Sequence, residues 1–247
     1  MSFNVYYAAL GGTTRLDGIA QAIANYRPDI ASLQEMWGER DQILSRVRSK
    51  TGLDYALSSG AQLWDGDILY RADCWKVVED GVIAYDGNRG MTWASMAHVQ
   101  TVRNLLVYGM HLLCRLGTDV QPHLRNVEML TAHAAARRER PDAPVLALGD
   151  FNAHEQEASM ALMRQGSLGA YGRGHTCSWS TTGITFIDTL RSAPNAGPGA
   201  DGNTGFGPKI AYIYTEAGRF VTTSAAIVRN APGGSVHFPV TAEVVLV

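Results

Sequence analysis

The feature that most constrains the fold of this chain is a set of short apolar runs that lead into polar residues. The clearest are Ile30–Leu33 before Glu35, Val145–Leu148 before Asp150, and Leu105–Leu113. Each run has the length of a buried strand and is far shorter than the ~20 residues that span a bilayer. The sequence therefore predicts sheets whose strand ends carry polar side chains, and it predicts no membrane segment.

Helical and extended patterns interleave along the chain. Apolar residues at helical spacing predict helices over Leu16–Tyr26, Ile43–Gly52, Pro122 to about Pro141, and Glu155–Arg164. Runs rich in β-branched and aromatic residues predict strands over the first ten residues, Ile30–Leu33, Ile68–Tyr70, Val77–Val78, Val82–Tyr85, Thr92–Val99, Leu105–Leu113, Val145–Leu148, Lys209–Thr215, Arg219–Arg229 and Phe238–Val247. Most strand connections are short enough for antiparallel pairing, so we expect an α/β (α+β) fold in which sheets pack face to face with helices outside.

Composition limits the class of protein. Of the 247 residues, 46% are hydrophobic and 18% are charged, which excludes an intrinsically disordered chain. The formal net charge of −2 gives no support to a dedicated nucleic-acid binder, which is usually strongly basic. The loosest stretch, Ser192–Pro208, is interpreted as a long surface loop, because too little chain follows it to form a second domain. We therefore expect a single domain over residues 1–247.

The cysteines and the first residues indicate a compartment. Cys74, Cys114 and Cys177 are far apart and form no CxxC pair, so neither a disulfide framework nor a structural zinc site is expected. Reduced thiols are the default in a cytoplasm. The first residues lack the charged start and long apolar core of a signal peptide, and we expect a cytoplasmic protein.

Asp150 and Asn152 form the most informative polar pair. They are two residues apart, so on an extended chain both face the same way. A carboxylate beside a carboxamide can hold a hard cation, a water or a phosphate oxygen, and Glu35 supplies a further oxygen ligand of the kind that Mg²⁺ prefers. Taken singly, each acid could instead serve as a turn or helix cap, and His111 could be a hydrogen-bonded core residue. The other histidines show no ligand spacing and are interpreted as solvated or structural: His98, His123, His133, His154 and His175.

The order of these segments resembles that of a known family. The segments are Ser2–Asn4 (SFN), Pro28–Glu35 (PDIASLQE), Gly109–Leu112 (GMHL) and Gly149–Asn152 (GDFN). In this order they resemble the endonuclease/exonuclease/phosphatase superfamily, and so do Asp67–Arg71, Asn88–Trp93, Lys209–Tyr214 and Ser235–Val240. The resemblance covers essentially the whole chain. It implies a DNase-I-like, four-layer αββα sandwich with the site at the edge between the two sheets.

The resemblance also implies roles for particular residues. Glu35 matches the family's magnesium-binding glutamate, and Asn4 matches the asparagine beside it. Asp150 and Asn152 match the pair that positions the nucleophilic water and the scissile phosphate. The implied cofactor is therefore Mg²⁺ or Mn²⁺.

Two histidines complete the implied site, and there the chain also departs from the family. His111 matches the phosphate-contacting histidine, and His237 matches the histidine that acts on the nucleophile or the transition state. Ala211 and Val236 stand where the family has aspartates. A histidine without an acid partner loses the hydrogen bond that fixes its tautomer, which can cost several orders of magnitude in rate.

Three functions remain open at this point. The first is a Mg²⁺-dependent phosphoester hydrolase that acts on a small or single-stranded substrate, since neutralising the phosphates of a duplex needs many Lys and Arg residues. The second is a repurposed family member that catalyses other chemistry in small-molecule metabolism, with the metal lost or optional. The third is a binding protein, against which the retained polar residues count. The sequence predicts no oligomeric state.

Two features of the site are also left open. Another acid, Asp188 or Asp67, could replace the missing partner of His237, although Asp188 is better interpreted as structural near a strand end. Several aromatic residues could line an apolar pocket, which would favour the repurposed function, but they are better interpreted as core or loop anchors: Trp64, Trp93, Trp179 and Phe206.

Overall fold

Two six-stranded sheets form the centre of the molecule. The computed structural model describes residues 1–6, 13–58, 65–85, 89–101, 103–114, 121–137, 143–166, 184–196, 202–205, 207–232 and 234–247. The first sheet has the order β11-β12-β1-β2-β4-β3, with β11 Phe220–Ile227, β12 Val240–Leu246, β1 Ser2–Asn4, β2 Ile30–Gln34, β4 Asp67–Arg71 and β3 Tyr55–Leu57. The second has the order β5-β6-β7-β8-β10-β9, with β5 Trp75–Ala84, β6 Gly90–His98, β7 Asn104–His111, β8 Val145–Asp150, β10 Ala211–Glu216 and β9 Phe186–Asp188.

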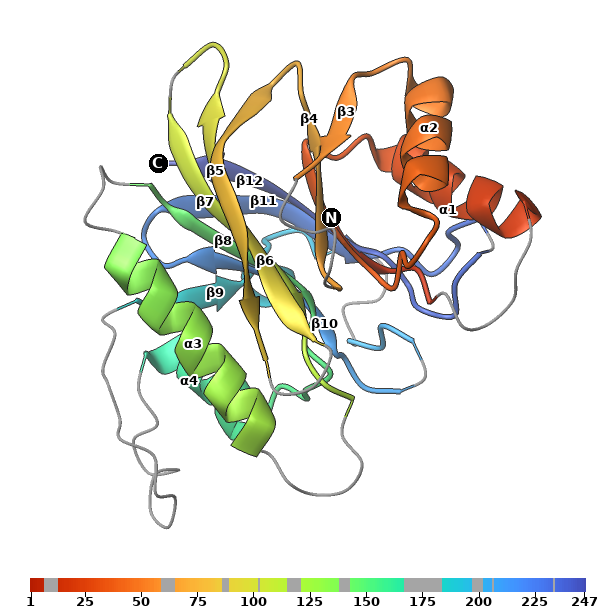
Figure 1. The fold of residues 1–247 in the computed structure, drawn as a ribbon. Helices are drawn as coiled ribbons and strands as arrows, with labels where there is room; N and C mark the ends of the chain where they lie inside the picture. Colours follow the sequence, from red (N-terminus) through yellow and green to blue (C-terminus); the bar gives the residue numbers. More distant parts are fainter. Residues whose placement is uncertain are drawn as a thin grey trace.

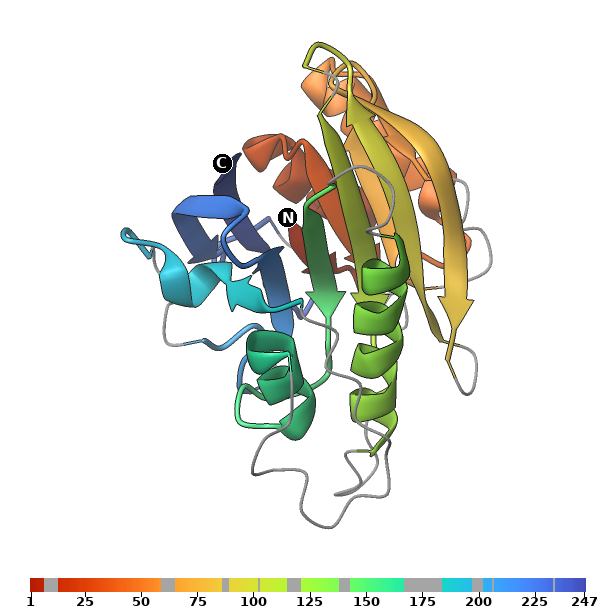
Figure 2. The ribbon, with the colours of Figure 1, turned by 90° about the vertical axis from the view of Figure 1, so that its left-hand side faces the viewer.

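Helices cover the outer face of each sheet. They are α1 Thr13–Tyr26, α2 Arg40–Thr51, α3 Gln121–Arg137 and α4 Ala158–Gln165. The single turn α5 Thr189–Ser192 instead contacts β10 and β11 and places Leu190 in the core between the sheets. Helices α1 and α2 lie on one flank of the molecule, and α3 and α4 lie on the opposite flank (Figure 1). In the perpendicular view, α3 and α4 lie on the side of the second sheet that faces the viewer (Figure 2). The order of layers is therefore helix, sheet, sheet, helix, as the resemblance implied.

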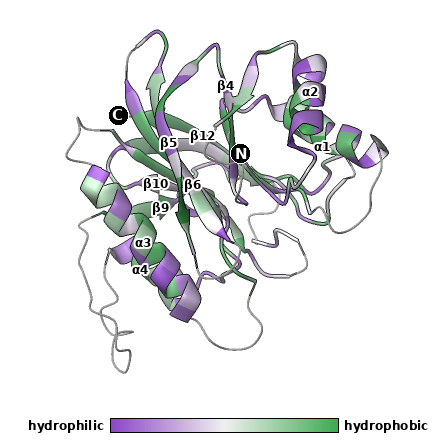
Figure 3. Cartoon of the chain, viewed as in Figure 1, coloured by the Kyte–Doolittle hydropathy of each residue, from purple (hydrophilic) through white to green (hydrophobic). Residues whose placement is uncertain are grey.

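Three apolar clusters hold these layers together. One joins α1 and α2 to the first sheet through residues such as Ile19, Ile43 and Phe3. A second joins α3 and α4 to the second sheet, and a third fills the space between the sheets. Helix α2 is largely hydrophilic (Figure 3). Within it only Ile43 and Val47 are buried. Burial of one narrow apolar stripe is what a helix on the outside of a sandwich requires.

Two parallel strand pairs bring the polar strand ends to one end of the sandwich. Strand β1 pairs with β2 so that Asn4 lies beside Gln34, and β7 pairs with β8 so that His111 lies beside Asp150. The other pairs are antiparallel, as the short connections predicted. Because the carboxyl ends of parallel strands meet at one edge, the side chains that follow these strands converge.

Several predicted boundaries differ from the structure. Strand β1 ends at Asn4, because the Asn4 side chain accepts a hydrogen bond from the Tyr6 N–H and Tyr6 has a positive φ of 42°. The two strands predicted over Val77–Tyr85 are a single strand, β5, with an irregularity between Val77 and Glu79. Helix α4 begins at Ala158 instead of Glu155, because Glu157 is extended.

The stretch from Ser192 to Pro208 is not simply a surface loop. Its first residue closes α5, and Thr204 is completely buried. The Thr204 hydroxyl accepts hydrogen bonds from the backbone N–H groups of Ile210 and Ala211, at 3.0 and 3.3 Å. Residues 197–201 and 206 lie outside the described part of the chain. Within that described part, no helix combines the length and the apolar character that crossing a membrane requires.

Candidate active site

The side-chain amide of Asn4 lies between two carboxylates. Its Nδ2 atom donates to Oδ2 of Asp150 at 3.0 Å and to Oε1 of Glu35 at 3.2 Å. Asn4 and Asp150 are buried, and the Glu35 side chain is 14% exposed. In the described part of the chain, neither carboxylate forms a salt bridge with a lysine or an arginine. Two neighbouring acids without such a partner create a local excess of negative charge.

The backbone is strained at two of the site residues. Glu35 has a φ of 61° and Asn152 a φ of 46°, which side chains other than glycine rarely adopt. The Asn152 N–H donates to Oδ1 of Asp150 at 2.9 Å, and Nδ2 of Asn152 donates to the Leu112 carbonyl at 2.8 Å. These bonds oppose the strain and hold Asn152 next to Asp150. Such strained positions cluster at functional sites in proteins.

Gly149 permits the close approach of β8 to β7 just before Asp150. Its φ is +154°, and a Cβ atom at this position would lie 2.0 Å from the Met110 carbonyl oxygen. No side chain fits there without displacement of the backbone. The position of Asp150 beside His111 therefore depends on this glycine.

His111 is held by an aspartate and an arginine, Asp65 and Arg89, which lie in two different connections between strands. Its Nδ1 atom lies 2.5 Å from Oδ2 of Asp65, and both side chains are 2% exposed. Nη1 of Arg89 lies 2.5 Å from the same Asp65 oxygen and 2.7 Å from Nε2 of His111. The Nε2 atom is also 4.0 Å from Oε1 of Glu35. This arrangement fits an imidazole that donates from Nδ1 to the Asp65 carboxylate.

The environment of Asp65 favours its charged form. Burial alone would raise the pKa of this carboxyl, but its neighbours outweigh burial and lower the pKa below the ordinary value. The hydrogen bond and charge of His111 contribute most, followed by the Glu35 backbone N–H at 2.5 Å and the Arg89 guanidinium. The Asp65 carboxylate therefore holds both the Glu35 backbone and the His111 ring in place.

His237 reaches the site from the loop before β12. Its Nδ1 atom lies 3.9 Å from Oδ2 of Asp150, and its ring centroid is 6.1 Å from that of Tyr6. Its backbone N–H donates to the Ser235 hydroxyl, which in turn donates to the Asn4 carbonyl at 2.7 Å. Burial lowers the pKa of His237, although the charges of Asp150 and Glu35 oppose this shift. A carboxylate that already belongs to the site thus lies close to its ring nitrogen.

The two positions that lack the family's aspartate have different surroundings. Ala211 is buried and lies directly opposite Asp150 in the ladder between β8 and β10. Val236 is 37% exposed and so faces solvent in part. Neither proposed substitute acid takes their place: Oδ1 of Asp67 lies 2.8 Å from Nη2 of Arg40, and Asp188 forms a salt bridge with Lys209. Asp188 also caps α5 through the Leu190 N–H, which is the structural role expected of it.

The structure thus brings together all six residues that the sequence singled out, and it adds two that were missed. The six are Asn4, Glu35, His111, Asp150, Asn152 and His237. Asp65 and Arg89 were missed because a single acid or a single arginine beside a strand carries no spacing signal. Trp93 does not belong to this group, since its ring packs against Arg137 at 3.8 Å. The other aromatic residues considered as pocket lining lie outside the described part of the chain, namely Trp64, Trp179 and Phe206.

The other described histidines have structural hydrogen bonds. His123 bonds to the Leu113 carbonyl at 2.7 Å, and Nδ1 of His133 lies 2.7 Å from the Tyr108 hydroxyl. Nδ1 of His98 accepts from two backbone N–H groups, and the His154 backbone N–H donates to Glu157. His175 lies outside the described residues.

Comparison with known proteins agrees with this architecture. The chain belongs to the endonuclease/exonuclease/phosphatase family, whose model matches residues 1–209. The members of this family include phosphatases and nucleases, and they generally depend on a divalent metal. No curated protein matches the sequence at a significant level.

Solved structures show the same fold at low sequence identity. The catalytic domain of human Nocturnin, solved with a bound sulfate, has a TM-score of 0.74 at 17% identity and covers 100% of this chain and 93% of that one. A mannosyl-6-phosphatase from Bacteroides thetaiotaomicron has a TM-score of 0.68 at 17% identity, with 94% and 91% covered. D. rerio TDP2, complexed with a single-strand DNA product, has a TM-score of 0.70 at 17% identity, with 99% and 97% covered. At these identities the likeness establishes the DNase-I-like fold.

Proposed function

We propose that this protein is a divalent-metal-dependent phosphoester hydrolase that acts on a small or single-stranded phosphoester. The observation that carries the proposal is the Asn4 amide placed between Glu35 and Asp150. Two adjacent carboxylates without a lysine or arginine partner favour the binding of a cation. The histidines of the same site offer donors for an anionic substrate.

The residues present fit Mg²⁺ or Mn²⁺. Glu35 and Asn4 would hold the ion through oxygen atoms, since the Asn4 carbonyl has a second lone pair besides the one that accepts from Tyr6. Mg²⁺ commonly uses only one or two protein carboxylates and keeps several waters. Among the described residues, no group of three His, Cys, Asp or Glu side chains is placed to hold a metal. When bound, the metal would polarise the phosphoryl group and neutralise part of its charge.

The remaining residues would act on the water and on the phosphate. Asp150 would orient the attacking water and accept its proton, as a positioned carboxylate does in general base catalysis. The Asn152 amide uses one N–H on the Leu112 carbonyl, and its second N–H would bind a phosphate oxygen. His111, with Arg89 beside it, would hold a second oxygen, and His237 would donate to the charge that develops in the transition state.

Charge supports a small or single-stranded substrate. The formal net charge is −2, whereas binding along a duplex requires many basic side chains to neutralise its phosphates. Two proteins with the same fold are in keeping with such substrates, namely the mannosyl-6-phosphatase and D. rerio TDP2 complexed with a single-strand DNA product. We further propose that residues 1–247 form one domain. The free thiols of Cys74 and Cys114 support a cytoplasmic location.

The first experiment is a calorimetric titration of Mg²⁺ and Mn²⁺ into metal-stripped protein. We expect the parent to bind and the Glu35→Gln variant to lose binding, because glutamine keeps the shape of the side chain without its charge. Asp41→Asn removes an exposed carboxylate of α2 and serves as the matched control. Its binding should equal that of the parent.

A hydrolysis assay completes the test. The substrates are an aryl phosphomonoester, an aryl phosphodiester, single-stranded DNA and duplex DNA, each with and without metal. We expect metal-dependent hydrolysis of a small or single-stranded substrate that Glu35→Gln and Asp150→Asn abolish. A parent protein that binds no metal and hydrolyses none of these substrates would overturn the proposal and favour repurposed chemistry.

A further inference from the structure

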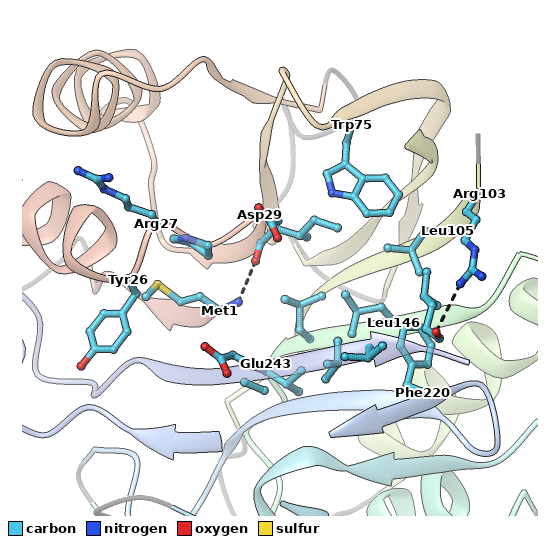
Figure 4. A pocket seen from close by; sticks show the side chains of 18 residues that line it. Met1, Tyr26, Arg27, Asp29, Trp75, Arg103, Leu105, Leu146, Phe220 and Glu243 are labelled. Atoms are coloured by element: carbon cyan, nitrogen blue, oxygen red, sulfur yellow. Dashed lines mark hydrogen bonds between the residues drawn. The ribbon is translucent and has the colours of Figure 1, made fainter. Parts of the chain in front are cut away.

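A pocket of about 560 Å³ lies between the two sheets (Figure 4). Residues from both sheets line it, among them Ile30 near the start of β2 and Leu146 near the start of β8. The catalytic residues follow the other ends of these strands. At about 3.3 Å per residue, Leu146 and Asp150 are about 13 Å apart along β8. The volume falls in the range typical of pockets for small ligands.

The interior of the pocket is aliphatic with two aromatic side chains. Its lining includes Leu105, Leu146, Leu148, Ile213, Trp75 and Phe220. All of these side chains are at most 9% exposed, so they belong to the core between the sheets. Facing sheets are about 10 Å apart, and a space left between them is a narrow slot. An unbranched alkyl chain fits such a slot better than a bulky ring system does.

The charges at the rim favour an anionic head group. Two acids line the pocket: Asp29 accepts from the Arg71 guanidinium at 3.1 Å, whereas Glu243 accepts only from the neutral Ser224 hydroxyl at 3.1 Å and keeps its charge. Figure 4 shows Glu243 away from the end of the pocket that Arg103 occupies. Arg103 has no carboxylate partner among the described residues, and its guanidinium donates to the Leu246 carbonyl at 3.4 Å. Figure 4 shows Arg103 at the end of the pocket next to Leu105 and Phe220. It is therefore a cation that stands beside an apolar slot.

We propose that this pocket binds a fatty carboxylate of medium length, with the alkyl chain between the sheets and the carboxylate on Arg103. A guanidinium can hold a carboxylate through two parallel hydrogen bonds. Burial of the alkyl chain against the aliphatic lining supplies the apolar part of the affinity. This binding site shares no residue with the active site and does not depend on the proposed hydrolysis.

The test uses dodecanoate, below its micelle concentration, in calorimetric titrations with the whole chain. We expect saturable binding with one site, and we expect Arg103→Gln to weaken it about tenfold, as the loss of a charge-assisted hydrogen bond predicts. Arg27 lines the other end of the pocket, and in Figure 4 its side chain points away from the centre. Arg27→Gln is therefore the matched control and should bind like the parent.

A second pair of variants tests the slot itself. Ala242 lines the pocket on β12, and Ala242→Phe should abolish dodecanoate binding by filling the space. Val221 on the neighbouring strand β11 is 50% exposed and is not among the lining residues, so Val221→Phe adds a similar ring without effect on binding. Glu35→Gln should bind dodecanoate like the parent. This result would show that the pocket binds its ligand independently of metal binding at the active site.

Two results would overturn the proposal. One is the absence of dodecanoate binding by the parent protein. The other is equal affinity for dodecanoate and dodecyltrimethylammonium, together with no effect of Arg103→Gln, because a cationic head group cannot use that guanidinium.

Discussion

His111 and Asp65 form a buried pair in which Nδ1 and Oδ2 are 2.5 Å apart. The two residues are separated by 46 positions in the sequence. The other Asp65 oxygen accepts from the backbone N–H of Glu35, the proposed metal ligand. One carboxylate therefore fixes the orientation of a proposed phosphate-binding ring and the strained backbone of a proposed metal-binding residue.

Replacing Asp65 should reduce catalysis far more than it reduces folding. Asp65→Asn removes the charge that orients His111, and we expect phosphoester hydrolysis to fall roughly 10²–10⁴-fold, the range typical of positioned acid–base groups. The measurement is kcat and KM for the best substrate from the hydrolysis assay. Asp73→Asn removes the exposed partner of Arg71 and is the control. An unchanged kcat in Asp65→Asn would show that His111 does not depend on this acid.

The stability of the protein should depend on pH through Asp67. Burial raises the pKa of Asp67 to about 8, with the Asp65 charge adding to the effect and Arg40 opposing it. The unfolded value is about 3.9, so the folded state binds the proton more tightly. The stabilisation from this group is therefore complete below about pH 3.9 and is lost as the pH rises through about 8.

In the Asp67→Asn variant the side chain is an amide, which does not titrate, so this dependence on pH is lost. We expect its free energy of unfolding, relative to that of the parent, to increase by at least about 1 kcal/mol between pH 4 and pH 9. Urea denaturation at a series of pH values measures this difference. Asp54→Asn removes an exposed carboxylate, and its free energy of unfolding should change with pH as that of the parent does. Parallel curves for Asp67→Asn as well would contradict the prediction.

Gly149 should tolerate no side chain. A Cβ atom there would lie 2.0 Å from the Met110 carbonyl, and the φ of +154° is unfavourable for any L-residue. We expect Gly149→Ala to cost more than about 3 kcal/mol of stability or to prevent folding. Gly38 also has a positive φ, +67°, but no atom lies within 4 Å of its Cβ position, so Gly38→Ala should cost only about 1 kcal/mol. Equal costs for the two variants, measured by chemical denaturation, would refute the role of the close contact.

Lys209 should stabilise the protein only together with Asp188. Its amine is buried, pairs with Asp188 and lies 3.7 Å from Oε1 of Glu155. Burial lowers the pKa of Lys209, although both acids oppose this shift. Lys209→Met would leave Asp188 buried beside an apolar side chain, and we expect a cost of about 3–5 kcal/mol.

The double variant Lys209→Met with Asp188→Asn removes both charges and keeps an oxygen to cap α5. It should recover most of the lost stability, which thermal and urea unfolding of the four proteins in this cycle would measure. Strictly additive costs would show that the two side chains do not interact.

The sequence by itself determined the parts of this protein that depend on local pattern. Alternating and continuous apolar runs predicted the strands that carry the site. The two-residue spacing of Asp150 and Asn152 predicted that they lie together, which a turn closed by the bond from the Asn152 N–H to Asp150 brings about in place of the extended chain expected. The order of short motifs predicted the family and the layered fold, both of which are confirmed. These features are visible in sequence because strand formation and a turn between adjacent residues depend on neighbours along the chain.

Only the tertiary structure decided which groups, far away in the sequence, surround the residues of the site. Asp65 and Arg89 reach His111 across 46 and 22 positions, because the pairing of β6 with β7 and the packing of the two sheets bring three connections to one point. The same packing excludes Asp67 and Asp188 as partners of His237 and leaves the slot beside Arg103. No local pattern encodes such contacts, since they follow from how whole sheets fit together.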